Sequence, residues 1–249
     1  MPSVNKENSG FTLVEMAMVL FIVTLLLAGL VPTISSQMEQ QRANETRKKM
    51  SEIKEALIGF ALRNGRLPCA ARAQTPAGQS NAGIDAGVEV TPCDNAGNAV
   101  NSQGVVPWVT LGTSETDGWG NRFTYRVTSD FADAIGATTG GCIPIPVQAT
   151  FGLCSIANLT VESKSGAGAT IVADQLPVII ISHGKNGAGA WTSSGTQRPV
   201  GSSTDELENS NHTDLIYISH TQTSTFDDLV EWISPNILYN RMVAAGKLP

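Results

Sequence analysis

The sequence predicts an α+β protein in which a long N-terminal α-helix packs on an antiparallel β-sheet head. One observation is a stretch from residue 11 to residue 64 with helical patterning, apolar in its first half and amphipathic in its second. The other is the rest of the chain, where short β-branched runs alternate with Gly, Asn, Asp and Ser clusters. We expect four segments: a leader at 1–10, a transmembrane helix at 11–31, the amphipathic half of the helix at 32–64 and a β-rich head at 65–249.

Composition indicates a folded protein without a broad nucleic-acid surface. The chain has 249 residues, of which 41% are hydrophobic and 15% are charged. Its formal net charge is -6, and residues 65–249 carry 9 basic against 16 acidic residues. A head with this acidic balance lacks the broad basic footprint that neutralises nucleic-acid phosphates.

Phe11–Val31 is the predicted transmembrane helix. It has 21 residues, no Pro and one charge, Glu15. At 1.5 Å per residue it is about 30 Å long, which matches the hydrocarbon core of a bilayer. A secretory signal peptide has a shorter apolar stretch that ends in a small-residue cleavage site, so we expect this helix to stay in the mature chain.

The helix is predicted to continue beyond Pro32, which removes a backbone donor and should kink it. Met50, Ile53, Leu57 and Phe60 recur on a 3.6-residue period, so they should form the buried stripe of the second half. Asn64 and Gly65, followed by Pro68, predict the end of the helix there.

The head is predicted to be an antiparallel sheet followed by a short helix. Strand-like runs occur at 105–111, 122–128, 159–162, 178–182 and 215–219. Ser234 and Pro235 predict the start of a terminal helix that ends before Gly246. Two long segments rich in small residues, 70–104 and 184–213, are expected to be loops, and loops of that length are often functional.

All four cysteines, Cys69, Cys93, Cys142 and Cys154, lie beyond the predicted membrane segment. Three pairings are possible, and pairing of sequence neighbours would pin two loops, with about 2–4 kcal/mol for each disulfide. Disulfides would indicate an oxidising compartment, whereas four buried free thiols would suit a cytosolic head. The spacing offers no C-x₂₋₄-C zinc site.

The segment Gly10-Phe11-Thr12-Leu13-Val14-Glu15 resembles the processing motif of type IV pilins and type II secretion pseudopilins. The resemblance covers residues 1–35 and implies a pilin-like fold. It implies that a membrane prepilin peptidase cuts after Gly10 and methylates the new amino group of Phe11. It also implies assembly with other pilin or pseudopilin subunits, and Pro32 stands where many members have a kinking Pro.

The resemblance places the chain in the bacterial inner membrane as a single-pass protein, with its head in the periplasm until it enters a filament. The charges around the span favour the opposite orientation, because Lys6 alone precedes it and Arg42, Arg47, Lys48 and Lys49 follow within about 20 residues. The leader motif and the cysteines favour the periplasm, and we follow them.

Glu15 is the predicted assembly residue. A carboxylate inside the hydrocarbon segment costs about 2.5–3.5 kcal/mol, so it needs a partner. After cleavage the amino group of Phe11, in the same chain or a neighbouring subunit, is the expected partner. The alternative is that Glu15 reaches the headgroups from near the helix end.

Two further segments resemble pseudopilin heads, namely the sequence DGWGNRFTY at 117–125 and SHGKNG at 182–187. Their glycines supply turns, and Trp119 and Tyr125 should be buried against the helix. Asp227 and Asp228 precede the sequence LVEW at 229–232, and some pseudopilin heads bind calcium near their last strands. The alternative for this pair is a solvated acidic turn, since no contiguous D-x-D-x-D-G loop is present.

The sequence contains none of the motifs G-x-S-x-G, H-E-x-x-H or G-x-x-x-x-G-K-[ST], so we expect no enzyme and no cofactor beyond calcium. The main hypothesis is a structural subunit of a type IV pilus or type II secretion filament, with size and loop length favouring a minor pilin or pseudopilin. The alternative is a filament-tip adhesin or binding module that uses loops 70–104 and 184–213. A third hypothesis is a membrane-anchored domain that is never cleaved.

Overall fold

The computed structural model describes residues 10, 12–93, 102–133, 148–211 and 214–248, without the side chains of residues 27–34. The chain divides into two compact units, Met1–Gln41 and Arg42–Pro249, which we describe separately. A single helix, α1 (Leu13–Asn64), contributes residues to both units. The predicted N-terminal helix is therefore present from Leu13 onward.

In the first unit, the described apolar side chains of α1 are exposed, from Leu13 to Leu26. Among the residues that the structure describes, no helix is long and apolar enough to cross a membrane. The predicted span at 11–31 includes Phe11 and the side chains of residues 27–31, which lie outside that description. The predicted kink at Pro32 also lies outside it, although the helix continues through this residue.

In the second unit, the predicted apolar stripe of α1 is buried. Met50, Ile53 and Leu57 have no exposed surface, while Phe60 is half-buried. The helix ends as predicted at Asn64, and Gly65 takes φ 69°. Only Gly fits there, because a Cβ would collide with the carbonyl oxygen of Gln148.

The head contains two main sheets and a small hairpin. Four antiparallel strands form the first sheet in the order β3 (Gln103–Val105), β4 (Thr124–Val127), β7 (Val178–Ser182) and β9 (Leu229–Ile233). The second sheet has the order β6 (Ile171–Leu176), β5 (Leu159–Glu162) and β8 (Ile216–Ile218). The hairpin pairs β1 (Ser80–Asn81) with β2 (Ile84–Asp85).

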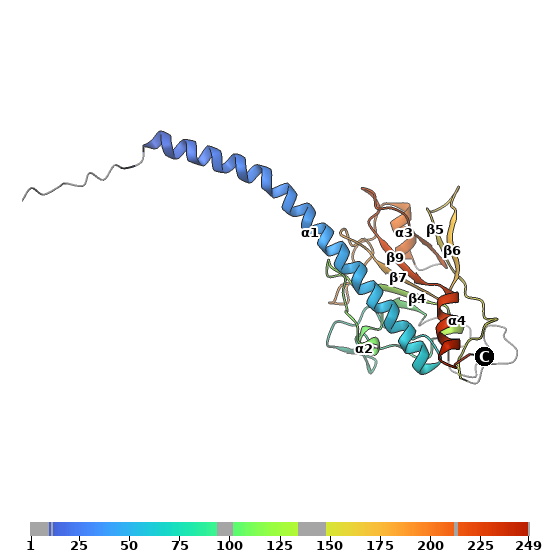
Figure 1. Cartoon of the computed structure of the whole chain (residues 1–249). Coiled ribbons are helices and arrows are strands. Elements are labelled where there is room, and N and C mark those ends of the chain that lie inside the picture. The colour runs from blue at the N-terminus through green and yellow to red at the C-terminus, as the bar shows by residue number, and fades with distance from the viewer. Residues whose placement is uncertain (1–9, 11, 94–101, 134–147, 212–213, 249) are drawn as a thin grey trace, which may run out of the picture. The chain divides into compact units, whose positions relative to one another are not determined.

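The head is layered around β7, the strand that is buried on both faces. Val178 and Ile180 belong to the core that includes the stripe of α1, and Ile179 and Ile181 belong to the core shared with the second sheet. Figure 1 shows the part of α1 that belongs to the second unit, coloured cyan, passing in front of the sheet that contains β4, β7 and β9. Alternating side chains of one β-branched strand thus join the helix, the first sheet and the second sheet.

Short helices connect the strands. They are α2 (Trp108–Leu111), the 3₁₀ helix at Ser129–Phe131, α3 (Thr204–Asn211) and α4 (Pro235–Ala244). Helix α4 follows Ser234 as predicted, but the Ser234 side chain makes no capping hydrogen bond. The residues of α4 that point inward, Leu238 and Met242, complete the core under α1.

Several sequence predictions for the head are wrong in detail. The predicted strand at 105–111 ends at Val105, because Pro107 has no backbone N–H and residues 108–111 form one helical turn. The sheet is not wholly antiparallel, since β5 and β8 pair in parallel. The structure adds β6, β9 and α3, whereas the strands at 159–162 and 178–182 have the predicted bounds.

The cysteines are paired where the structure describes them. Cys69 and Cys93 form a disulfide, as the pairing of sequence neighbours predicts. Cys154 is also disulfide-bonded, and Cys142, its expected partner, lies outside the described residues. No described cysteine is free, so the alternative of free thiols is wrong for these three residues. The disulfide between Cys69 and Cys93 links the beginning of the loop that follows α1 to a position 24 residues further along the chain.

Candidate functional site

Three reciprocal hydrogen bonds between Thr12 and Glu15 cap the N-terminal end of α1. Thr12 donates its backbone N–H and its Oγ1–H to Glu15 Oε2, each at 2.8 Å. In return, Glu15 donates its backbone N–H to Thr12 Oγ1 at 3.3 Å. This is a capping box, in which the residue before the helix and the third helical residue satisfy each other's backbone donors.

Glu15 therefore already has a local partner, Thr12, which our sequence analysis did not identify although the T-x-x-E spacing was available. One of its carboxylate oxygens receives both bonds, so the other oxygen is left for a further donor. Gly10 is exposed, and Phe11, whose amino group is the predicted partner of Glu15, lies outside the described residues.

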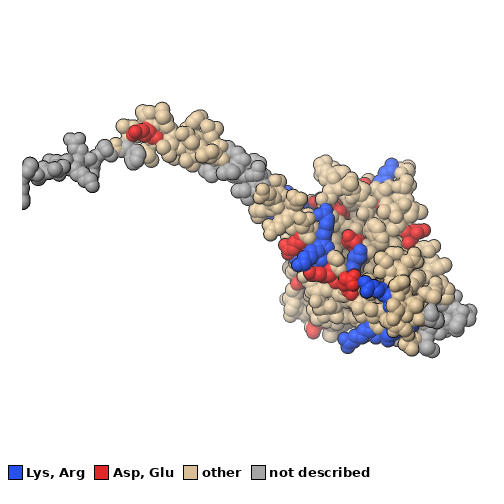
Figure 2. Space-filling model, in the orientation of Figure 1, with Lys and Arg blue, Asp and Glu red and all other residues tan. Residues whose placement is uncertain are grey.

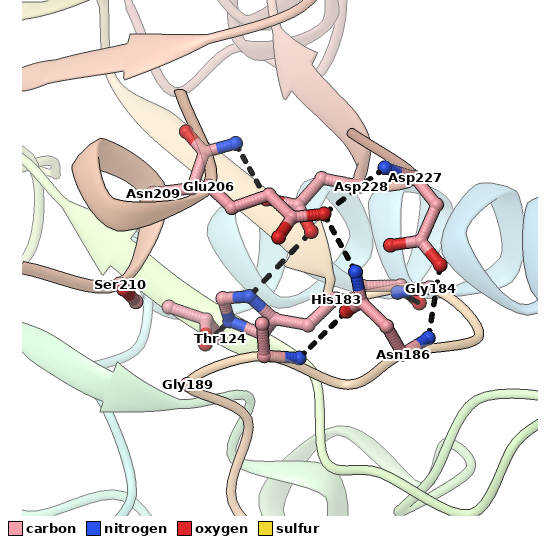
Figure 3. Close-up of polar contacts among 12 residues, drawn as sticks. Thr124, His183, Gly184, Asn186, Gly189, Glu206, Asn209, Ser210, Asp227 and Asp228 are labelled. Carbon is pink, nitrogen blue, oxygen red and sulfur yellow. Dashed lines mark hydrogen bonds and ion pairs between the residues drawn. The ribbon is translucent and has the colours of Figure 1, made fainter. Parts of the chain in front are cut away.

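The head contains a second candidate site, a cluster of three carboxylates: Glu206, Asp227 and Asp228. One carboxylate oxygen from each residue lies within 4.8 Å of one from each of the other two. Asp227 and Asp228, the two residues that the sequence suggested, immediately precede β9, whereas Glu206 comes from α3 and was not predicted. Figure 3 shows the Glu206 side chain pointing toward both aspartates, with Asn186 and Asn209 beside them.

Hydrogen bonds fix each carboxylate of this cluster through one oxygen. Glu206 Oε1 accepts from Asn186 Nδ2 at 2.7 Å and from the Asp227 backbone N at 3.3 Å. Asp227 Oδ2 accepts from the backbone N of Asn186 at 2.9 Å, and Asp228 Oδ2 accepts from Asn209 Nδ2 at 2.7 Å. The other oxygens of the two aspartates, both named Oδ1, are buried and accept no hydrogen bond within the described residues.

The electrostatics of the cluster disfavour three negative charges without a cation. Burial raises the pKa of Asp228 well above its usual range, and the nearby charges of Glu206 and Asp227 raise it further. The hydrogen bond from Asn209 opposes this shift. Asp228 is 3% exposed and Glu206 is also 3% exposed, so solvent screens their repulsion weakly.

The donor set suits a hard divalent cation. Carboxylate oxygens are the ligands that Ca²⁺ prefers, and two of those present are buried without a hydrogen bond. A pocket adjoins the cluster, and its lining includes Glu206, Asn186, Arg198, Val200 and Thr225.

Next to the cluster, Thr124, His183 and Asp228 follow one another as the nucleophile, base and acid of a catalytic triad would. Thr124 Oγ1 and His183 Nε2 are hydrogen-bonded at 2.8 Å, and His183 Nδ1 lies 3.8 Å from Asp228 Oδ1. Thr124 is 2% exposed and His183 is fully buried. The Thr124 hydroxyl is enclosed in the core, so we interpret His183 as a structural histidine. The contacts of Thr124, His183 and Asp228 join β4 to the end of β7 and the start of β9.

The two head segments singled out in the sequence meet at a buried carboxylate. Asp117 Oδ1 accepts from the backbone N of Trp119 and of Asn121, each at 2.9 Å, and Asp117 Oδ2 accepts from Ser182 Oγ at 2.7 Å. These bonds fix the turn before β4 against the end of β7. Tyr125 is buried as predicted, while Trp119 is half-buried.

Asp117 makes the stability of the head depend on pH. Burial raises its pKa, and the hydrogen bonds from Ser182, Asn121 and Trp119 oppose the shift only in part. A carboxyl group with a raised pKa in the folded state favours folding at low pH, and this contribution is lost as pH rises through the folded pKa. We expect the free energy of unfolding of the wild type, measured relative to Asp117→Asn by urea titration, to fall as pH increases above 4. A difference that is constant or grows with pH would contradict this account.

Arg122 joins the two long loops. It is fully buried and donates to the carbonyl oxygens of Ala73 and Thr75, each at 2.8 Å, and of Ser193 at 3.2 Å. Its guanidinium pairs with Glu115 at 2.9 Å and lies 4.6 Å from the centroid of a Trp108 ring. The loops at 70–104 and 184–213, which the binding-module alternative uses together, therefore contact each other.

Charges on the face shown in Figure 2 are mixed, with basic and acidic side chains side by side rather than in one basic patch. Along the described part of α1, Lys49 pairs with Glu45 at 2.8 Å, and Lys54 pairs with Glu231 at 2.7 Å. This arrangement agrees with the acidic composition of the head.

Comparison with known proteins gives one match. Residues 5–31 match the family model described as the prokaryotic N-terminal methylation motif, the signature of type IV pilins and pseudopilins. No curated protein and no solved structure matches the chain. The motif indicates a type IV pilin-like or pseudopilin precursor, and it implies processing by a prepilin peptidase and assembly with other pilin subunits.

Proposed function

Because the chain carries the N-terminal methylation motif at residues 5–31, we propose that it is a minor pilin or pseudopilin of a type IV pilus or type II secretion filament. The peptidase cuts between Gly10 and Phe11 and methylates the Phe11 amino group. The mature chain is then held in the inner membrane by the apolar segment at 11–31, with its head in the periplasm, until it enters the filament. The observation that carries this proposal is the match to the motif, supported by the capping box at Thr12 and Glu15.

Assembly is the activity of such a subunit, and no catalytic step is assigned to it. The exposed apolar side chains of Leu13–Leu26 bury surface when they pack among the helices of sister subunits. Glu15 keeps one carboxylate oxygen outside its bonds with Thr12, and this oxygen receives the Phe11 amino group of a neighbouring subunit. That contact sets the axial register, because only one offset brings the two charges together.

The test is to shear filaments from cells that express the chain under its own promoter and to probe the filament fraction with an antibody to the head. The proposal predicts the chain in that fraction at low abundance relative to the main subunit. Its absence from filaments under conditions in which other subunits are recovered would overturn the proposal.

The second candidate is a filament-tip binding module, and one observation favours it: loops 70–104 and 184–213 contact each other through Arg122 and through a hydrogen bond from Ala77 N to Ser193 O of 2.8 Å. Gln79 and Ser194 are exposed on the two loops and can be changed without touching the core. If the head binds a surface, Gln79→Glu combined with Ser194→Glu abolishes adhesion while filament number stays normal. If the chain is purely structural, the double variant changes neither.

We also propose that the head binds one Ca²⁺ through Glu206, Asp227 and Asp228. Saturating calcium, at 100 times Kd, is expected to stabilise the wild type by about 2.7 kcal/mol. In Asp228→Asn the stabilisation by calcium should disappear. Without calcium this variant should be more stable than the wild type, because the substitution removes a buried charge that lies beside the charges of Glu206 and Asp227. Thermal unfolding with calcium and with chelator measures both effects, with Asp174→Asn on the exposed face of β6 as control. A wild type that is indifferent to calcium would remove the proposal.

A further inference from the structure

Asn186 holds two carboxylates of the proposed calcium site at once. Its side-chain Nδ2 donates to Glu206 Oε1 at 2.7 Å, and its backbone N donates to Asp227 Oδ2 at 2.9 Å. Figure 3 shows Asn186 between these residues, on the loop that follows β7. Each bond engages one oxygen of a carboxylate and leaves the other oxygen available.

The loop around Asn186 is shaped to keep this position. Gly184 and Gly187 take φ 57° and 61°, and the Gly187 backbone N donates to His183 O at 2.9 Å. The side-chain Oδ1 of Asn186 accepts from the Ala188 backbone N at 2.8 Å, which fixes the amide so that Nδ2 faces Glu206. A Cβ on Gly184 would collide with the carboxylate of Asp227, so the turn and the aspartate fit closely.

Asn209 does the same for the third carboxylate. Ile218 on β8 fixes the Asn209 amide from both sides, since Asn209 Oδ1 accepts from Ile218 N at 2.7 Å and Nδ2 donates to Ile218 O at 3.0 Å. The same Nδ2 donates to Asp228 Oδ2 at 2.7 Å. The two asparagines thus hold all three carboxylates through one oxygen each.

We infer that Asn186 is the positioning residue of a cation clamp that fastens the loop after β7 and helix α3 to the start of β9. This inference rests on the proposed calcium site. With one oxygen of each carboxylate engaged, the remaining oxygens of Glu206, Asp227 and Asp228 are oriented before the ion arrives, which raises affinity by reducing the cost of ordering. Because the three ligands come from α3 and from the two residues before β9, ion binding links segments about 20 residues apart in the chain, including the second of the two long loops.

The test compares Ca²⁺ binding by calorimetry for the full chain in detergent micelles. Asn186→Ala should raise the Kd for Ca²⁺ at least tenfold, because Glu206 loses its side-chain donor while the backbone donor to Asp227 stays. Asn186→Ser, which keeps a hydroxyl donor, should recover part of the affinity. Asn240→Ala, an exposed asparagine on α4, is the matched control and should bind calcium as the wild type does.

Hydrogen exchange provides the readout for the clamp. Calcium should slow amide exchange in residues 184–190 and 204–211 of the wild type, and this protection should be lost in Asn186→Ala at the same calcium concentration. A variant that is merely less stable would bind calcium with wild-type affinity well below its unfolding temperature. Equal affinity of the wild type and Asn186→Ala, or binding without slower exchange, would overturn the inference. A wild type that binds no calcium would overturn the calcium site itself and would leave the filament proposal standing.

Discussion

Glu15→Gln is expected to leave the chain helical and inserted in the membrane but to reduce its incorporation into filaments to background. Gln can replace Glu in a capping box, because its side-chain oxygen accepts the same bonds from Thr12 N and Thr12 Oγ1. The substitution therefore removes the charge and keeps the cap. In our account the charge is what attracts the amino terminus of the neighbouring subunit, so assembly loses its register. The measurement is the ratio of chain in sheared filaments to chain in membranes.

Thr12→Ala separates the two roles of Glu15. It removes the hydroxyl of the cap, worth about 1 kcal/mol, and leaves the Glu15 charge in place. We expect a partial decrease of incorporation for this variant and a complete loss for Glu15→Gln. If Glu15 served only to cap the helix, Thr12→Ala would be the more damaging change and Glu15→Gln would assemble normally. That order of effects would contradict the role of Glu15 in register.

Arg122→Met is expected to destabilise the head by about 3–5 kcal/mol, since it breaks a buried ion pair and leaves partners unsatisfied. Three carbonyl oxygens, from Ala73, Thr75 and Ser193, lose their donor, and Glu115 loses its charge partner. Arg122→Lys should be almost as damaging, because an ammonium cannot reproduce the fork of a guanidinium. Urea unfolding followed by tryptophan fluorescence reports the change, with Trp108 directly under the guanidinium.

Arg63→Met is the control for Arg122, because Arg63 is exposed in the last turn of α1. We expect it to change the free energy of unfolding by less than about 0.5 kcal/mol. A similarly small effect of Arg122→Met would mean that the Arg122 contacts do not stabilise the packing of the long loops. The binding-module alternative would then keep only the hydrogen bond between Ala77 and Ser193 as support for one surface.

The sequence was informative where one physical signal dominates. The stripe through Met50, Ile53 and Leu57 has the helical period, so the burial of this face was predictable. Residues 178–181 are an uninterrupted β-branched run, Val-Ile-Ile-Ile, which is typical of a strand buried on both faces. By contrast β6 is largely exposed, so it has no hydrophobic alternation, and α3 is a polar eight-residue helix. The sequence of β6 and of α3 therefore shows no hydrophobic periodicity by which the element could be predicted.

The residues of the candidate sites were predictable only where the interaction is local in sequence. Asp227 and Asp228 were identifiable because they are adjacent, but Glu206 and Asn186 reach them through the tertiary fold, from α3 and from the loop after β7. Arg122 lies in a recognisable segment, yet nothing in the sequence indicates that its side chain is buried among carbonyl oxygens. The capping box was readable from Thr12 and Glu15 alone, because its geometry is local.

The most direct measurement of the central claim is the intact mass of the chain extracted from membranes of cells that contain the peptidase, together with the sequence of its first residues. Our account predicts a mature protein that begins at Phe11, lacks residues 1–10 and carries one additional methyl group on the new amino terminus. A protein that retains Met1 and the leader in such cells would contradict it.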